Sequence, residues 1–406
     1  MSDFHQAGII GTLHRLRDRP IEELDREILG WSEETPVGLL VPSLFSELHG
    51  PALPEIVKQL ALVPYLDTIV VPVGRASAEE FEEAKQFFSA LPQRTVLIWI
   101  EGPRIQQLLE DFKSAGLPIG EPGKGRALWL ALGYFLAENR CHTIALHDAD
   151  ILTYSRELVA RLVYPLVSRQ IDFDFCKGYY ARVSDRLHGR VTRMLVFPLL
   201  RALEIVIGNH PYIRYLASFR YPLAGEFALD ASLANVVRIP SNWGVEVGVL
   251  SEVYRNRSTR RICQAEILNS YDHKHQVVSE NDPSTGLHRM AIDIVTHLLQ
   301  TLSQTGISFD EGALRSLLTV YRRTAEDFVA IYFADATIDG LKYDRHSEEA
   351  LLGVFIGAIR TAIERFRADP IGQPDLPNWI RVRAAIEDVG DRLVDIVRSD
   401  GGLLAP

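Results

Sequence analysis

Cysteine is scarce in this chain of 406 residues, with one each at positions 141, 176 and 263. Their odd number and wide spacing lack the pairing of a zinc site or a disulfide framework, and favour a reducing cytoplasm. Long apolar runs are absent too, since the longest, such as 37–41 and 69–73, are far too short to span a bilayer. The first residues show no basic segment before an apolar core, so we expect no secretory signal and no membrane association.

An excess of positive charge is also missing. Lys and Arg total 43 against 53 Asp and Glu, for a net charge of −10. A general nucleic-acid binder normally shows a basic stripe, so we expect no nucleic-acid partner, although a few local cations would suffice for an anionic substrate. With 47 % hydrophobic and 24 % charged residues, the composition is that of an ordinary globular protein with one large or two ordinary domains.

Strand-like and helix-like segments alternate in the first third of the chain. The predicted strands are 37–42, 68–73, 95–100 and a run that ends before Asp148, and the predicted helices are 54–62, 78–91, 104–115 and 125–138. Alternation at these lengths predicts an α/β fold with a mostly parallel sheet and right-handed crossovers. Many chemistries share that architecture, and nucleotide binding is the first interpretation to test.

The flanking segments have a different period. Residues 1–35 place apolar side chains at helical spacing and predict an N-terminal helical arm, which either braces the domain or supports oligomerisation. The α/β pattern continues more loosely to residue 285, and from 286 to 406 strands disappear while apolar residues follow helical stripes. We therefore expect an α/β domain at 36–285 and an appended helical region at 286–406 that serves packing or dimerisation.

Two aspartates follow the buried strand-like run 142–147. Asp148 and Asp150 share a face if the strand continues, because side chains at i and i+2 point the same way. At the carboxyl end of a parallel strand they would form a site for a hard divalent cation held against a diphosphate. In the alternative interpretation, Asp148 caps a turn and Asp150 leads into the next helix.

A lysine between two glycines precedes the helix predicted at 125–138. Gly123 and Gly125 would let the backbone approach a ligand closely, and Lys124 could neutralise a phosphate oxygen at the helix N-terminus. The spacing is not that of a Walker A loop. A plain surface turn explains the segment equally well when it is considered alone.

Three more segments downstream carry candidate site residues. Gly225 could allow backbone contact with a sugar hydroxyl, and Glu226 could accept hydrogen bonds from hydroxyls, although an ordinary turn also explains the glycine. Glu246 falls in the first turn of a predicted helix, where stabilising the helix dipole is the simpler role. His273 belongs to the densest histidine cluster, and its imidazole could be a third ligand to an ion held by Asp150; a solvated polar loop is the alternative.

Taken in order, these motifs resemble those of the retaining GT-A glycosyltransferases that make glucosyl-3-phosphoglycerate, mannosyl-3-phosphoglycerate and mannosylglycerate. The matching segments are Pro-Gly-Lys-Gly at 122–125, Asp-Ala-Asp at 148–150, Pro-Leu-Ala-Gly-Glu at 222–226 and Gly-Val-Glu at 244–246, followed by His273. The resemblance implies a Rossmann-like GT-A fold with a C-terminal helical extension. Residues 36–150 would be the nucleotide-sugar half and residues 151–285 the acceptor half.

The resemblance also implies roles for residues on the donor side. Asp150 and His273 would coordinate Mg²⁺ or Mn²⁺, with Asp148 close by as a further ligand or a contact to the ribose. Lys124 would meet the diphosphate. The segment Pro42, Ser43 and Leu44 matches the base-binding segment of the family, although Phe45 and Ser46 precede the acidic Glu47 where the family often has the acid directly.

On the sugar and acceptor side, Gly225 and Glu226 match the sugar-binding segment, and Glu246 matches an acidic position near both substrates. His275 and Arg190 are our candidates for the acceptor site. Phe197 precedes Pro-Leu-Leu where the phosphoglycerate enzymes carry an arginine. Because phosphate recognition favours bidentate cations, free D-glycerate competes with 3-phosphoglycerate as the acceptor, unless Arg190, Arg193 or Arg201 supplies the cation.

The leading hypothesis is a metal-dependent, retaining transferase of glucose or mannose from a nucleotide-diphosphate sugar to glycerate or phosphoglycerate, for compatible-solute synthesis. The metal and Lys124 would stabilise the leaving diphosphate, and Glu226 or Glu246 would assist as an orienting group or a transient partner. A nucleotidyltransferase and a non-catalytic sugar-nucleotide-binding protein are the alternatives. We expect a cytoplasmic homodimer.

Overall fold

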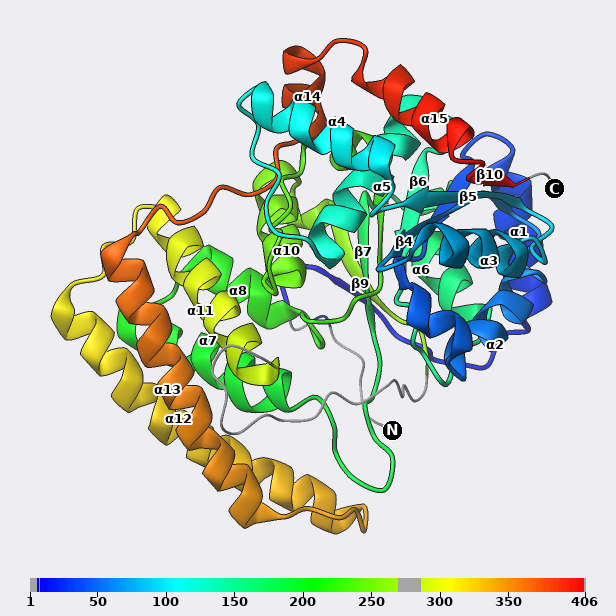
Figure 1. The fold of residues 1–406 in the computed structure, drawn as a ribbon. Coiled ribbons are helices and arrows are strands. Elements are labelled where there is room, and N and C mark those ends of the chain that lie inside the picture. Colours follow the sequence, from blue (N-terminus) through cyan, green and yellow to red (C-terminus); the bar gives the residue numbers. More distant parts are fainter. Residues whose placement is uncertain (1–5, 7, 269–285, 405–406) are drawn as a thin grey trace.

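The computed structural model describes residue 6, residues 8–268 and residues 286–404. One mixed sheet runs through its centre, in the order β1-β9-β7-β8-β6-β2-β4-β5-β10, with β3 paired to β4 (Figure 1). The strands are β1 (Gly11–Leu13), β2 (Val37–Leu40), β3 (Ser43–Leu44), β4 (Leu66–Gly74), β5 (Arg94–Trp99), β6 (Thr143–Leu146), β7 (Phe175–Tyr179), β8 (Phe227–Asp230), β9 (Ile262–Glu266) and β10 (Leu403–Leu404). The predicted α/β fold is confirmed.

The pairing pattern divides the sheet at its middle. Strands β6, β2, β4 and β5 are parallel to one another, as the alternation predicts. Beyond β6 the direction changes, because β8 runs antiparallel to both β6 and β7. The start of β8 therefore lies beside the end of β6, with Phe227 opposite Leu146. The strand order also reverses at β2, because the chain continues to β4 and β5 on one side and returns to β6 on the other; ligands of open α/β sheets bind at the carboxyl ends of the strands at such a point.

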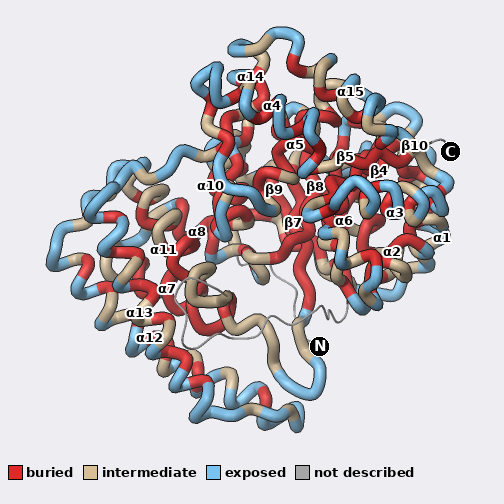
Figure 2. The backbone as a smooth tube through the Cα atoms, in the orientation of Figure 1, coloured by how far each residue is buried: buried red, intermediate tan, exposed pale blue. Residues whose placement is uncertain are grey.

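Helices cover both faces of the sheet. The helices of the α/β part are α1 (Ile21–Ser32), α2 (Ala52–Leu60), α3 (Ala78–Phe88), α4 (Pro103–Ser114), α5 (Lys124–Glu138), α6 (Glu157–Val167), α7 (Phe197–Ile207), α8 (Pro211–Ser218), α9 (Ala231–Val236) and α10 (Val245–Asn256). Neighbouring strand residues enter opposite core layers: Leu39 of β2 packs with Leu53 of α2, and Leu40 packs in the layer of Trp129 of α5. Figure 2 shows the sheet as the most continuously buried part of the chain.

The N-terminal segment differs from the prediction of a helical arm. Only Ile21–Ser32 is helical among the described residues before 36, whereas Gly11–Leu13 forms β1 and pairs in parallel with β9. The side chain of Gln6 accepts from and donates to the backbone of Thr12. The helical prediction for residues 9–16 was wrong because hydrogen bonding to β9, a strand far away in the sequence, outweighs local spacing. Leu16, which the helical pattern counted as apolar face, is exposed.

The C-terminal helices fall into two groups. The first comprises α11 (Gly286–Gln304), α12 (Glu311–Ile338) and α13 (Arg345–Ala368); α11 and α12 both pack on α13, and α12 also packs on α7 (Figure 1). The second comprises α14 (Trp379–Ala385), which packs on α9, and α15 (Val389–Ser399), which packs on α4 and α5. The chain then adds β10 antiparallel to β5, so the expectation that strands disappear after residue 286 was wrong at residues 403–404.

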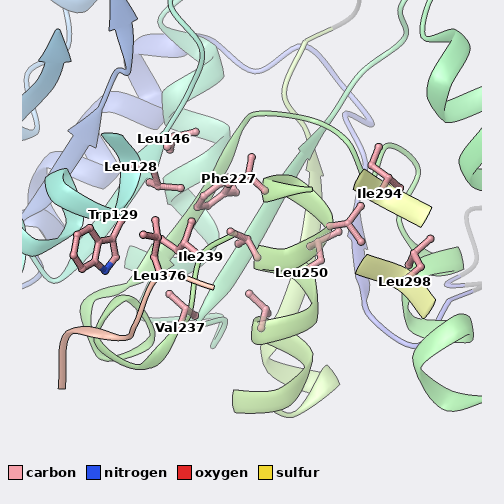
Figure 3. Close-up of a cluster of buried hydrophobic side chains, with 14 of the residues drawn as sticks. Leu128, Trp129, Leu146, Phe227, Val237, Ile239, Leu250, Ile294, Leu298 and Leu376 are labelled. Carbon is pink, nitrogen blue, oxygen red and sulfur yellow. The ribbon is translucent and has the colours of Figure 1, made fainter. Parts of the chain in front are cut away.

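One apolar cluster joins the sheet to these helices. Leu128 and Trp129 of α5 lie near Leu376, and the cluster continues to Ile294 and Leu298 of α11 (Figure 3). The C-terminal region therefore shares its core with the α/β part. No helix among the residues that the structure describes is long and apolar enough to cross a membrane.

Candidate active site

The carboxyl end of β6 is the place where four of the predicted segments meet, 122–125, 148–150, 222–226 and 244–246. Asp148 follows β6, and Gly225 lies just before β8, which starts beside the end of β6. A Cβ atom at Gly225 would overlap the carboxylate of Asp148, so a side chain cannot be added there without displacing that carboxylate. The antiparallel entry of β8 thus explains why a glycine stands at this position.

Two carboxylates meet at one ammonium group, that of Lys124. Lys124 begins α5, and its Nζ lies 2.6 Å from Oδ1 of Asp148 and 3.1 Å from Oε1 of Glu246, in the first turn of α10. A Cβ atom at Gly125 would overlap the carbonyl oxygen of Pro240, so this glycine permits the close approach of α5 to the segment before α10. Burial lowers the pKa of Lys124, but Asp148 and Glu246 outweigh it and raise the pKa well above its usual value. The ammonium group therefore stays charged.

Asp150, the second aspartate of the pair, has a raised pKa. Burial and the neighbouring charge of Asp148 raise the pKa of Asp150 to about 7, although Lys124 opposes this. Two carboxylates at a sheet edge are hard oxygen donors that suit Mg²⁺ or Mn²⁺, which usually bind one or two carboxylates together with substrate phosphates. No group of three His, Cys, Asp or Glu side chains within residues 8–268 and 286–404 could by itself hold a metal ion. The predicted third ligand, His273, lies outside the described residues.

The nucleotide-binding segment predicted at Pro42, Ser43 and Leu44 lies at the same edge of the sheet. It follows β2, which is parallel to β6 and aligned with it, so that Leu40 is opposite Leu146. Ser43 and Leu44 form β3 against the end of β4. Ser43 is buried, whereas Leu44 is exposed. The segment therefore lies one strand away from the aspartates.

Glu226 lies at the bottom of the site and is fully buried. The hydroxyl of Tyr180 donates to its Oε2 at 2.7 Å. A carboxylate held in this way keeps a fixed orientation, which suits an acceptor of hydrogen bonds from a ligand.

Lys177 is a residue of this site that we did not predict. It is fully buried in β7, and its Nζ donates to the carbonyl oxygen of Ala224 at 2.6 Å, which holds the backbone just before Gly225. Burial lowers the pKa of Lys177 to about 8, although Glu246 and Glu226 oppose this. A lysine inside an apolar strand is a signal that could have identified it, because buried lysines are rare unless they are paired.

His147 contacts the backbone of the aspartate turn, and we did not predict it from the sequence. Its ring is fully buried, with Nδ1 at 3.0 Å from the carbonyl oxygen of Asp148 and Nε2 at 3.0 Å from the hydroxyl of Tyr154. Burial lowers the pKa of His147 to about 4, so the ring is neutral at physiological pH. With one nitrogen donating and the other accepting, the ring fixes the backbone of the Asp-Ala-Asp turn.

Two of the three arginines predicted as acceptor cations lie together, and the third lies apart. Arg190 and Arg193 both pair with Glu348 of α13. Arg201 instead pairs with Glu204 on its own helix and lines a separate cavity, together with Phe197. His275, the other acceptor candidate, lies outside the described residues.

The mixed sheet with its C-terminal helices is a GT-A-like fold. Solved structures share the fold: glucosyl-3-phosphoglycerate synthase from Mycobacterium tuberculosis, in complex with Mg²⁺ and UDP, matches with a TM-score of 0.52 and 24% identity over 75% of this chain and 89% of that one. Mannosyl-3-phosphoglycerate synthase from Rubrobacter xylanophilus matches with a TM-score of 0.55 and 20% identity over 74% of this chain and 83% of that one. No protein-family model matches the sequence.

Two relatives match over nearly their whole length. The chain is 45% identical over 400 residues to glucosyl-3-phosphoglycerate synthase from Persephonella marina, covering 98% of this chain and 99% of the relative. It is 38% identical over 404 residues to the enzyme of the same name from Methanococcoides burtonii, covering 98% of each. The chain therefore belongs to the glucosyl-3-phosphoglycerate synthase family. The predicted hexosyltransferase is confirmed over the nucleotidyltransferase and the non-catalytic alternatives.

Proposed function

We propose that this protein transfers glucose from UDP-glucose to 3-phosphoglycerate with the help of Mg²⁺ or Mn²⁺. The observation that carries the proposal is the meeting of Lys124, Asp148 and Gly225 at the carboxyl end of β6. Full-length similarity to two glucosyl-3-phosphoglycerate synthases supports the choice of glucose over mannose and of the phosphorylated acceptor over D-glycerate. The M. tuberculosis enzyme of the same name has been solved with Mn²⁺, UDP-glucose and phosphoglyceric acid.

On the donor side, the proposal assigns metal binding to Asp150 and His273, with Asp148 beside them. A divalent ion bound there would supply positive charge to the diphosphate. Lys124 adds a second cation, since its ammonium group already lies between two carboxylates and can rotate toward a phosphate oxygen. The segment 42–44 would hold the base of the nucleotide.

The transfer itself breaks the bond between the anomeric carbon of glucose and the diphosphate oxygen. The acceptor hydroxyl attacks the anomeric carbon from the face that the phosphate leaves, and the departing phosphate oxygen takes the hydroxyl proton. Configuration is then retained without a protein nucleophile. Lys124 stabilises charge that develops on the leaving diphosphate, the kind of interaction that usually contributes most to catalysis.

The two glutamates orient the substrates in this scheme. Glu226, held by Tyr180, accepts hydrogen bonds from sugar hydroxyls together with the backbone at Gly225. Glu246, held by Lys124, lies where the sugar and the acceptor meet. Arg190 and His275 bind the acceptor, and Arg190 provides the cation that the Phe197 position lacks.

The proposal extends to the organisation of the protein. Residues 36–150 form the nucleotide-sugar half, residues 151–285 form the acceptor half, and residues 1–35 and 286–406 are flanking regions. We propose a cytoplasmic homodimer. Sedimentation of the purified protein tests the oligomeric state, since a single species of monomer mass would contradict the dimer.

An assay of the purified protein tests the reaction. UDP-glucose, 3-phosphoglycerate and Mg²⁺ should yield UDP and a glycosylated acceptor, and GDP-mannose or D-glycerate should be poorer substrates. Release of pyrophosphate would instead indicate a nucleotidyltransferase. Tight binding of UDP-glucose without turnover on any acceptor would indicate a non-catalytic binding protein.

A further inference from the structure

A buried glutamate of the C-terminal helices holds two arginines of the acceptor half. Glu348 lies in the first turn of α13, and its side chain is only 6% exposed. Its Oε1 accepts from Nε of Arg190 at 2.9 Å, and its Oε2 accepts from Nη2 of Arg193 at 3.3 Å. One carboxylate therefore bridges two cations across a separation of more than 150 residues.

Arg193 has more contacts than Arg190 and is less exposed to solvent. Nε of Arg193 also donates to the carbonyl oxygen of His188 at 2.8 Å, and its guanidinium lies 4.9 Å from the ring centre of Tyr332. Arg193 is 10% exposed, whereas Arg190 is 41% exposed. Arg193 thus neutralises Glu348 inside the protein, and Arg190 contributes a net positive charge at the surface. A surplus of one positive charge on an oriented guanidinium suits an anionic ligand.

Arg190 is connected to the sugar side of the active site. The preceding residue, Gly189, has φ +72°, and a Cβ atom there would lie 3.8 Å from the ring of Tyr221. That ring packs 5.2 Å from the ring of Tyr180, whose hydroxyl donates to Glu226. Arg190 therefore follows a residue that lies beside Tyr221, and Tyr221 packs on the tyrosine that holds the buried carboxylate of the sugar site.

The loop before Arg190 is also attached to the α12–α13 hairpin. The backbone nitrogen of Lys342, between these helices, donates to the carbonyl oxygen of Asp185 at 2.9 Å. The side chains of the same two residues form an ion pair at 2.9 Å. Thus the C-terminal hairpin contacts this loop at two places, through Lys342 at Asp185 and through Glu348 at Arg190.

We propose that Glu348 is a positioning residue that orients Arg190 toward the phosphate group of the acceptor. The proposal rests on the proposed function, in which Arg190 binds that phosphate. Glu348 holds the Nε edge of the guanidinium, and the rest of the partly exposed group faces the ligand. The C-terminal hairpin thereby contributes to recognition of the acceptor without touching it.

The test is a comparison of steady-state kinetics for Glu348→Gln and Glu349→Gln. Glu349 is the next residue on α13 and pairs with Arg345 at the surface, so its substitution is the matched control. We expect Glu348→Gln to raise KM for 3-phosphoglycerate about tenfold, the scale of losing a group that orients a ligand-binding residue. The control should leave this KM unchanged. In both variants, kcat and KM for UDP-glucose should stay near the values of the unmodified protein.

A double-mutant cycle with Arg190→Ala separates this proposal from the function on which it rests. If Arg190→Ala raises the acceptor KM and Glu348→Gln adds nothing further in that background, the positioning role is supported. If Arg190→Ala has the effect and Glu348→Gln alone has none, the positioning role is overturned and the acceptor site stands. If Arg190→Ala has no effect, the proposed acceptor site itself fails.

Stability measurements distinguish positioning from a purely structural role. An equal rise in KM for both substrates, together with a lowered Tm, would overturn the proposal. A fall in the KM for the acceptor would also overturn it, because Glu348 would then compete with the acceptor for Arg190. Glu348→Asp keeps the charge and should recover part of the affinity. Failure of both Glu348 variants to fold would also overturn it, by showing that the carboxylate serves the core.

Discussion

Residues 36–150 and residues 286–404 differ in how far along the chain their elements find partners. In the first region, β2 pairs with β4 and β4 with β5, so most neighbours in space are also neighbours in sequence, and β6 is the strand that returns to a distant partner, β2. In the second, β10 pairs with β5, and the ring of Trp379 stacks on Trp129 with 5.0 Å between centres. Local periodicity therefore describes the first region well, whereas the second depends on contacts that no local pattern encodes.

We expect the largest effect from a substitution at the carboxyl end of β6, where the proposed metal site lies. Asp150→Ala should lower kcat about 1000-fold, because it removes a carboxylate that would hold the metal beside the diphosphate. A chelator should have a similar effect that added Mg²⁺ or Mn²⁺ reverses. Asp395→Ala, at a residue of α15 whose side chain is 73% exposed, is the control and should keep full activity. Full activity of Asp150→Ala would contradict the proposed metal site.

The next prediction asks whether the C-terminal region is independent of the sheet. Trp379 is buried, and its Nε1 donates to the carbonyl oxygen of Trp129 at 3.0 Å. Trp379→Ala should lower the free energy of unfolding by about 3–5 kcal/mol, as expected for a large side chain removed from a core. Urea unfolding measures this, with Ile380→Ala as the control because Ile380 is 49% exposed. A loss confined to the unfolding of a separate C-terminal unit would contradict the shared core.

A pair of glycine substitutions compares the active site with the hairpin directly. Gly225→Ala should lower kcat/KM about 100-fold, because the added methyl group displaces the Asp148 carboxylate from its position. Gly353→Ala, in α13, meets nothing within 4 Å and should leave activity unchanged. Since glycine weakens a helix interior, the same change should stabilise the protein by about 0.5–1 kcal/mol. Equal activity of the two variants would show that the approach of Gly225 to Asp148 is not needed.

The smallest expected effect concerns a buried carboxyl of α1. Burial raises the pKa of Asp25 from 3.8 to about 6, against the lowering effect of Arg156. Because the folded pKa is raised, Asp25 stabilises the fold fully below pH 3.8, and this contribution is lost as the pH rises through about 6. Asp25→Asn should therefore be more stable than the unmodified protein at pH 7.5, by about 1 kcal/mol.

This advantage of Asp25→Asn should disappear below pH 4, where both side chains are neutral. Thermal unfolding across this pH range measures it, with Asp18→Asn as the control, because the Asp18 side chain is 88% exposed. An advantage of Asp25→Asn that is the same at every pH would point to a packing effect.

Much of the α/β part could be predicted because apolar residues repeat at one spacing in strands and at another in helices. The helix expected at 125–138 is observed at Lys124–Glu138, and the strand expected at 95–100 is observed at Arg94–Trp99. Asp148 and Lys124 could be selected because their two motifs occur in order with the segments at 222–226 and 244–246. The structure brings the two side chains within 2.6 Å of each other, and their roles in a site stay predictions.

The sequence by itself determined the order of strands and helices, the apolar faces and the aspartates at the end of a buried strand, since all of these follow from spacing over a few residues. Only the tertiary structure decided that Gly11–Leu13 would be a strand, that β8 would enter antiparallel, and that Glu348 would meet Arg190. Along the chain, Glu348 resembles any glutamate in the first turn of a helix. Its partner is chosen by packing between elements far apart in sequence, where hydrogen bonds and burial outweigh local propensity.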